Sequence, residues 1–294
     1  MSFKIEKSFK TALRSSWIIL KLIVPIYIIA DLLFYYDVLK HITFIFKPLV
    51  TILGLPQEAA LSIVSGLFLN LYAAIAFAAP LGLSAKEWTI LALFLGIAHA
   101  LLVETEIMKK LGIKRSYSIA LRLLTGFIVA YIVSYFPESW FHSLSQDSSM
   151  LSQPIHYETI TALLKNSLYE AFSLSIKVIA LVTLLIFFLD FIKSLSFIEH
   201  YSQKVNSGFS ITVGVILGIT YGAGILISEY EKGSLQHKEI LFIGTYLMIC
   251  HAIIEDTLLF VIFGANPWII VSLRFLFATL VSYLVIKFLK PKTT

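Results

Sequence analysis

Residues 90–112 read ILALFLGIAHALLVETEIMKKLG, an apolar run that contains a histidine and two acids near its middle. Its length suits a membrane-crossing helix, because a hydrocarbon core of about 30 Å needs about 20 helical residues. A second run at 242–264, FIGTYLMICHAIIEDTLLFVIFG, carries the same His-Ala pair followed by acids. Ionisable groups are costly in lipid, so both runs predict a membrane protein with a buried polar site.

The composition of the whole chain also indicates a membrane protein. Of 294 residues, 58% are hydrophobic and 14% charged, and the mean hydropathy is +0.87, whereas a soluble domain is about 25% charged. This balance excludes a soluble enzyme, a nucleic-acid-binding protein and a disordered chain. We attribute the net charge of +5 to cytoplasmic loops rather than to contact with nucleic acid. The single cysteine leaves no disulfide framework.

Eight hydrophobic spans are expected, and the first is interpreted as retained rather than removed as a signal peptide. Two shorter segments, 38–54 and 193–207, are interpreted as re-entrant, half-helical or interfacial pieces because they are too polar to face lipid. A polar, serine-rich linker covers 137–166. The expected spans are 17–36, 58–81, 88–108, 117–136, 168–192, 208–228, 239–262 and 268–289.

The two halves of the chain resemble each other. A shift of 152 residues aligns 86–136 with 238–288 without a gap, and 15 of the 51 aligned positions are identical. We interpret this as a duplicated unit, with a first membrane repeat at 1–136 and a second at 167–294. The polar residues of the first copy that recur unchanged in the second are Lys86, Glu87, His99, Thr105, Arg122 and Tyr131.

Basic residues set the expected orientation. They cluster before residue 15, at 109–115 and after residue 289, whereas the linker at 137–166 holds three acids and one lysine. Because cytoplasmic loops are rich in lysine and arginine, both termini and 109–115 are expected on the cytoplasmic side of the plasma (inner) membrane. The linker is expected on the opposite, extracytoplasmic side. This needs an odd number of crossings per half. We therefore expect an all-α, polytopic transmembrane helical bundle of two tandem, inverted repeats with re-entrant or broken helices.

The densest set of ionisable residues is the motif His-Ala-x-x-x-(Glu/Asp)-Thr at 99–105 and 251–257. Two imidazoles with nearby carboxylates suit proton coupling or a divalent cation, so we predict a polar site at the membrane midplane. Asn70 and Tyr221, which lie in other expected spans, could line a cavity at the same site. The predicted binding residues are His99, Glu104, Thr105, His251, Glu255, Asp256, Thr257, Asn70 and Tyr221.

A packing role is the alternative for part of this set. Glu104 could pair with Arg122, and Asp256 with Arg274, only to hold neighbouring helices together. On a regular helix His99 and Glu104 lie about 140° apart, so they face one site only if the helix is irregular there. No glycine or proline lies at that point to break it.

Known catalytic signatures are missing from the sequence. It contains no G-x-x-x-x-G-K-[ST] phosphate loop, no H-E-x-x-H zinc-protease motif and no G-x-S-x-G elbow. We therefore expect neither an enzyme nor a bound cofactor, and leave open whether a metal binds. The driving force would come from an ion gradient, the solute gradient or a separate partner.

One known family shares several features with the first half. The segment 45–77, IFKPLVTILGLPQEAALSIVSGLFLNLYAAIAF, and the following LSAKEWTILALFLGIAHALLVETEIMKKLG resemble the Gate domain, also called the nucleoside-recognition domain. The shared features are an apolar segment ending LGLP, E-x-A-x-x-x-x-x-G, and L-S-x-x-E before the next span. The resemblance covers 45–135, with a degenerate copy at 197–288.

Gate domains occur in concentrative nucleoside transporters, in the membrane part of ferrous-iron transporters and in spore-maturation-type membrane proteins. The resemblance implies inverted repeats with re-entrant hairpins and interrupted helices around a central substrate path. Our leading hypothesis is accordingly a multi-pass permease for a small solute, either nucleoside-like or an ion. The alternatives are a non-transporting component of a hetero-oligomeric Gate-protein complex and a membrane-embedded metal-dependent hydrolase. The expected partners are the lipid bilayer, the solute and another copy or subunit.

Overall fold

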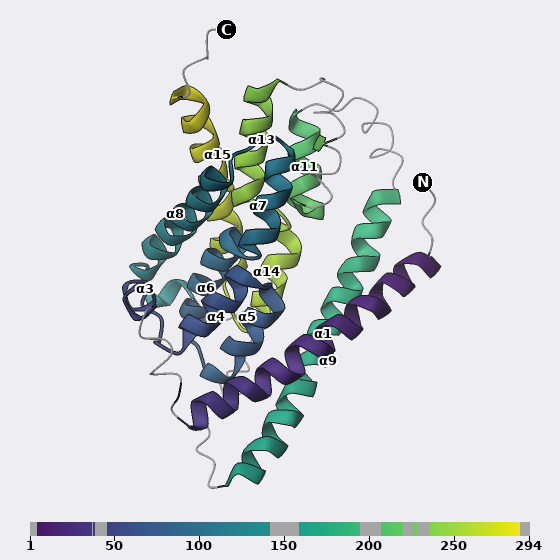
Figure 1. Cartoon of the computed structure of the whole chain (residues 1–294), viewed down its shortest axis with the longest axis vertical. Coiled ribbons are helices and arrows are strands. Elements are labelled where there is room, and N and C mark those ends of the chain that lie inside the picture. Colours follow the sequence, from purple (N-terminus) through teal and green to yellow (C-terminus); the bar gives the residue numbers. More distant parts are fainter. Residues whose placement is uncertain are drawn as a thin grey trace.

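The computed structural model describes residues 5–36, 38, 46–141, 159–194, 207–219, 226–227 and 236–288. Every regular element in these ranges is a helix, and six helical segments are long and apolar enough to cross a membrane. They form the bundle shown in Figure 1. The prediction of an all-α, polytopic membrane bundle is therefore confirmed.

The six long segments divide equally between the halves of the chain. In the first half they are α1 (Ile5–Tyr35), the interrupted pair α6 (Ala85–Ala98) and α7 (Leu101–Lys110), and α8 (Arg115–Ser134). In the second half they are α9 (Ile160–Ser194), the interrupted pair α13 (His237–Ile249) and α14 (Ile253–Val261), and α15 (Pro267–Phe288). Each half thus has three long segments, and the distribution of basic residues predicts an odd number of membrane crossings per half.

The first long helices of the two halves, α1 and α9, lie together along one side of the molecule (Figure 1). Ser8 donates a hydrogen bond to Asp190 (2.8 Å), and Ser167 donates one to Asp31 (2.5 Å). The start of each helix thus contacts the end of the other, so they run antiparallel. This is the relation that two inverted halves would have.

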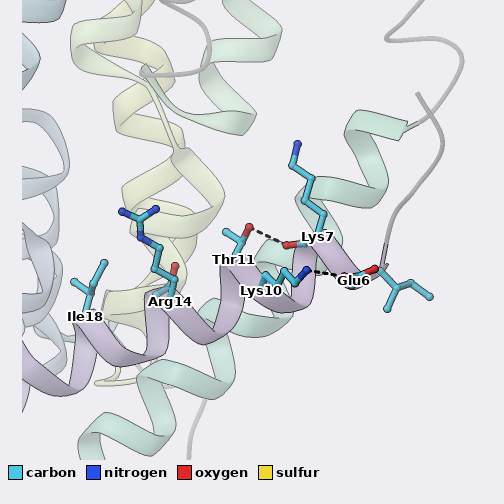
Figure 2. A pocket seen from close by; sticks show the side chains of 8 residues that line it. Glu6, Lys7, Lys10, Thr11, Arg14 and Ile18 are labelled. Atoms are coloured by element: carbon cyan, nitrogen blue, oxygen red, sulfur yellow. Dashed lines mark hydrogen bonds and ion pairs between the residues drawn. The ribbon is translucent and has the colours of Figure 1, made fainter.

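The described part of α1 begins at Ile5, well before the predicted span 17–36. This end carries basic side chains, and Figure 2 shows Lys10 beside Glu6 (2.6 Å) and Thr11 bonded to the carbonyl oxygen of Lys7. A pocket of about 900 Å³ lies here, and its described lining residues all belong to α1. None of them is a predicted site residue.

The predicted single span at 58–81 is wrong, because the chain turns back in its middle. It forms two short helices that pack on each other, α4 (Ala59–Phe68) and α5 (Leu71–Ala78), followed by the 3-10 turn η2 (Ala79–Leu81). Leu69 leaves the helical conformation (φ −110°, ψ −89°), and the Asn70 side chain accepts the N–H of Ala73 at 3.0 Å. Asparagine is a favoured helix N-cap, so Asn70 marks the turn of a hairpin.

The other short elements lie in segments that the structure describes in part. Within 38–54 it shows α3 (Lys47–Ile52), and after α8 it shows the 3-10 turn η3 (Glu138–Trp140). In the predicted span 208–228, α11 (Ser207–Leu217) ends before Gly218, whose φ is +89°. Most of the linker and of 193–207 lies outside the described residues.

Candidate functional site

Both membrane helices that carry the His-Ala motif are interrupted at that motif. His99 ends α6 with an extended backbone (ψ 162°), and Ala100 has φ 45° before α7 begins. In the second copy Cys250 leaves the helix (φ −134°, ψ 80°), and Ala252 has φ 44° before α14 begins. The irregular helix that convergence requires is therefore present in both copies, without a glycine or proline at the break.

Backbone contacts hold the two alanines in this conformation. The N–H of Ala100 bonds to the carbonyl oxygen of Gly66 in α4 at 2.9 Å, and the N–H of Ala252 bonds to that of Gly214 in α11 at 3.4 Å. Among the described non-glycine residues, only these two have a positive φ. Such a conformation is strained for a residue with a Cβ atom, so the surrounding structure imposes both breaks.

We predict that Ala100→Gly stabilises the protein, because glycine removes this strain. The free energy of unfolding should rise by roughly 1 kcal/mol, the usual cost of a left-handed backbone for an L-residue. The matched control is Ala98→Gly, two residues earlier in regular α6, which should lower it by about 0.5–1 kcal/mol or more. Unfolding in detergent, followed by circular dichroism, measures both. A loss of stability in Ala100→Gly would contradict the assignment of strain.

Two buried arginines bind the open helix ends. Arg122 in α8 donates to the carbonyl oxygens of Ile97 (2.7 Å) and His99 (2.6 Å) at the end of α6. Arg274 in α15 donates to Ile249 (3.1 Å) and His251 (2.7 Å) at the end of α13. Both side chains are fully buried. They therefore replace the helical hydrogen bonds that the breaks remove.

The same arginines also make the predicted ion pairs. Arg122 lies 2.8 Å from Glu104, and Arg274 lies 3.1 Å from Asp256. The packing alternative for these four residues is thus confirmed as far as the pairing goes. Packing by ion pairs does not account for His99 and His251, which approach Glu104 from two different helices.

Three side chains, His99, Glu104 and His251, form what we call the His–Glu–His cluster. The Nε2 atom of each histidine lies 3.2 Å from Oε1 of Glu104. The two imidazole rings face each other across 5.3 Å between their centroids. Glu104 and His251 are buried, and the side chain of His99 is 12% exposed. Two breaks that are 152 residues apart in sequence therefore share one polar site.

Backbone carbonyls select the tautomer of both rings. Nδ1 of His99 lies 2.9 Å from the carbonyl oxygen of Leu95, and Nδ1 of His251 lies 2.7 Å from that of Leu247. A carbonyl oxygen only accepts hydrogen bonds, so Nδ1 must carry the hydrogen. In a neutral ring Nε2 then has a lone pair beside the Glu104 carboxylate. Each of these lone pairs repels the anionic oxygen unless a proton or a metal cation lies between them.

The second copy does not repeat this arrangement of acids. Asp256 pairs with Arg274 and makes no described contact with either imidazole within ion-pair distance. Its neighbour Glu255 accepts a hydrogen bond from the Tyr72 hydroxyl in α5 at 3.2 Å, which joins the hairpin to α14. The acids of the second copy therefore make other contacts, and Glu104 is the carboxylate that lies 3.2 Å from both histidines.

The remaining predicted residues either have other contacts or lie outside the described part of the chain. The hydroxyl of Thr105 lies 3.3 Å from that of Ser118, and Thr257 is buried. Asn70 caps α5 and points its amide oxygen into the hairpin turn. Tyr221 lies outside the described residues. The second acid of the first copy, Glu106, forms an exposed pair with Arg115.

Comparison with known proteins supports a membrane protein but does not assign the chain to a family. The chain is similar to a Bacillus subtilis (strain 168) protein described as the uncharacterized membrane protein YvoD, with 26% identity over 280 residues. The match covers 92% of this chain and 89% of that protein. No protein-family profile and no solved structure matches the chain. Together with the six long apolar segments, this defines an integral membrane protein.

Proposed function

We propose that the protein is a secondary transporter of the Gate type, a permease that moves a small solute through the His–Glu–His cluster. One observation carries the proposal: two interrupted membrane helices bring the imidazoles of two histidines within 3.2 Å of one carboxylate, away from bulk water. Many secondary transporters build their substrate sites from broken helices at the membrane midplane. Ionisable residues inside a membrane are energetically costly, so their presence there points to a function.

The surrounding elements support the same proposal. A helical hairpin, α4–α5, packs beside the first break and contacts the second through the Tyr72–Glu255 hydrogen bond. Hairpins and interrupted helices around a central path are what the resemblance to Gate domains implies. We place both termini and 109–115 in the cytoplasm and α1 to α15 in the plasma membrane, in line with the distribution of basic residues.

The single cysteine of the chain allows a test that does not depend on the solute. Cys250 is buried at the break of α13. If access alternates, a small membrane-impermeant thiol reagent should label Cys250 slowly from either side of reconstituted vesicles. Labelling from neither side, or from one side only, would favour a non-transporting component of a larger complex.

Two control variants establish which face of the membrane the thiol reagent reaches. Lys110 at the end of α7 and Trp268 at the start of α15 are both exposed, and the expected topology places them on opposite faces. In a Cys250→Ser background, Lys110→Cys should react only from the cytoplasmic face and Trp268→Cys only from the outer face. Reaction of both variants from the same face would overturn the proposed topology.

A further inference from the structure

We infer that the His–Glu–His cluster binds a divalent transition-metal cation, through Nε2 of His99, Nε2 of His251 and Oε1 of Glu104. The inference deepens the proposed function by naming the class of solute, and rests on it for any role in transport. The three ligand atoms lie within 4.8 Å of one another. Nothing else in the described part of the chain offers such a group.

Two of the three spacings between the ligand atoms, those from Glu104 to each histidine, fit tetrahedral coordination. A metal with bonds of about 2.0–2.1 Å to nitrogen and oxygen separates its ligand atoms by about 3.3 Å in a tetrahedron. Both Nε2–Oε1 distances are 3.2 Å. Three protein ligands leave the fourth position for water or another exchangeable ligand, as in metal sites that remain chemically open.

The hydrogen bonds around the cluster prepare the ligand atoms. Each imidazole uses Nδ1–H on a helix carbonyl, of Leu95 or Leu247, which leaves Nε2 to bind a metal. Metal-binding histidines usually have such a second contact, which fixes the tautomer and the ring orientation. Nε2 of His251 is buried and makes no hydrogen bond of acceptable geometry. A cation between the rings would satisfy it.

Charge and ligand type point to the class of cation. The two helix ends hold three carboxylates, Glu104, Glu255 and Asp256, against the guanidinium groups of Arg122 and Arg274. Arg122 approaches Glu104 through Oε2, so Oε1 remains available for a cation. Imidazole nitrogen favours ions such as zinc, cobalt, nickel and iron over calcium and magnesium, which prefer oxygen ligands alone.

The test is metal binding by the full chain in detergent, purified without a histidine tag. After treatment with a chelator, CoCl2 and ZnCl2 should each bind at one ion per chain, with the strong visible absorption of tetrahedral cobalt. His99→Gln and His251→Gln should each weaken binding at least about 100-fold. His237→Gln, which changes an exposed histidine at the start of α13, is the matched control and should bind as the natural chain does.

Several outcomes would overturn the inference. These are failure of the natural chain to bind cobalt at one ion per chain, equal binding by all three variants, and displacement of cobalt by a modest excess of calcium or magnesium. If the histidine variants do not fold, X-ray absorption of the zinc-loaded natural chain decides, because it should show imidazole nitrogen at about 2.0–2.1 Å. A spectrum without imidazole ligands would also overturn it.

Uptake by reconstituted vesicles separates this inference from the proposed function. Uptake of radioactive zinc that requires both histidines would support both. Stoichiometric binding without uptake would keep the metal site and count against the permease. Uptake of a nucleoside such as uridine by a chain that binds no metal would keep the permease and overturn the metal site.

Discussion

Replacing Arg122 with leucine should lower the free energy of unfolding by about 3–5 kcal/mol, the usual cost of breaking a buried ion pair from one side. The substitution leaves the Glu104 carboxylate without its cation and the carbonyls of Ile97 and His99 without their donor. Arg274→Leu should cost a similar amount, since Arg274 binds the second helix end in the same way.

Arg115→Leu is the matched control for this prediction. Arg115 begins the same helix, α8, but it is exposed and pairs with Glu106 at the surface. Exposed pairs contribute about 0–1 kcal/mol, so this variant should remain close to the natural chain. Unfolding in mixed detergent, followed by circular dichroism, measures all three. Similar losses in Arg115→Leu and Arg122→Leu would show that the helix-end contacts do not stabilise the fold.

Replacing Glu104 with glutamine should abolish stabilisation by the bound solute, because its carboxylate lies 3.2 Å from both histidines. Binding should weaken by at least about 100-fold, or about 2.7 kcal/mol, since every tenfold change is about 1.4 kcal/mol. The measurement is the rise in melting temperature of the purified chain with zinc, cobalt, uridine or adenosine. Glutamine preserves the shape of the side chain, and a neutral amide can still accept a hydrogen bond from Arg122.

Glu106→Gln is the control, since it makes the same chemical change two residues along the same helix. Glu106 is exposed and lies outside the His–Glu–His cluster, so its variant should keep the full response. The Glu104 variant must first show a cooperative melt to demonstrate that it folds. An undiminished response in folded Glu104→Gln protein would remove Glu104 from the site.

The sequence predicted most of what hydrophobicity and charge determine. Six of the eight expected spans correspond to the six long apolar segments of the described residues, because burying a helix in lipid requires an apolar composition over about 20 residues. The internal repeat aligns His99 with His251, and their imidazole rings lie 5.3 Å apart between centroids. The excess of basic residues at 109–115 indicates an odd number of crossings per half, and the described residues contain three long apolar segments in each half.

The sequence was less informative where backbone conformation depends on distant contacts. The apolar run at 58–81 is continuous and so predicts one span, although Asn70 inside it is a residue typical of a helix N-cap. The breaks at Ala100 and Ala252 have no local signal, because alanine favours a continuous helix. Contacts with Gly66 and Gly214, far away in sequence, hold them instead.

The double role of the arginines has a mechanical consequence. Arg122 binds the end of α6 and the acid of α7 from α8, and Arg274 joins α13, α14 and α15 in the same way. Each trio of helices is therefore braced internally and resists bending at its own break. The His–Glu–His cluster lies between the trios, where His251 approaches Glu104. A movement of one trio against the other would therefore change the distance between the two imidazoles.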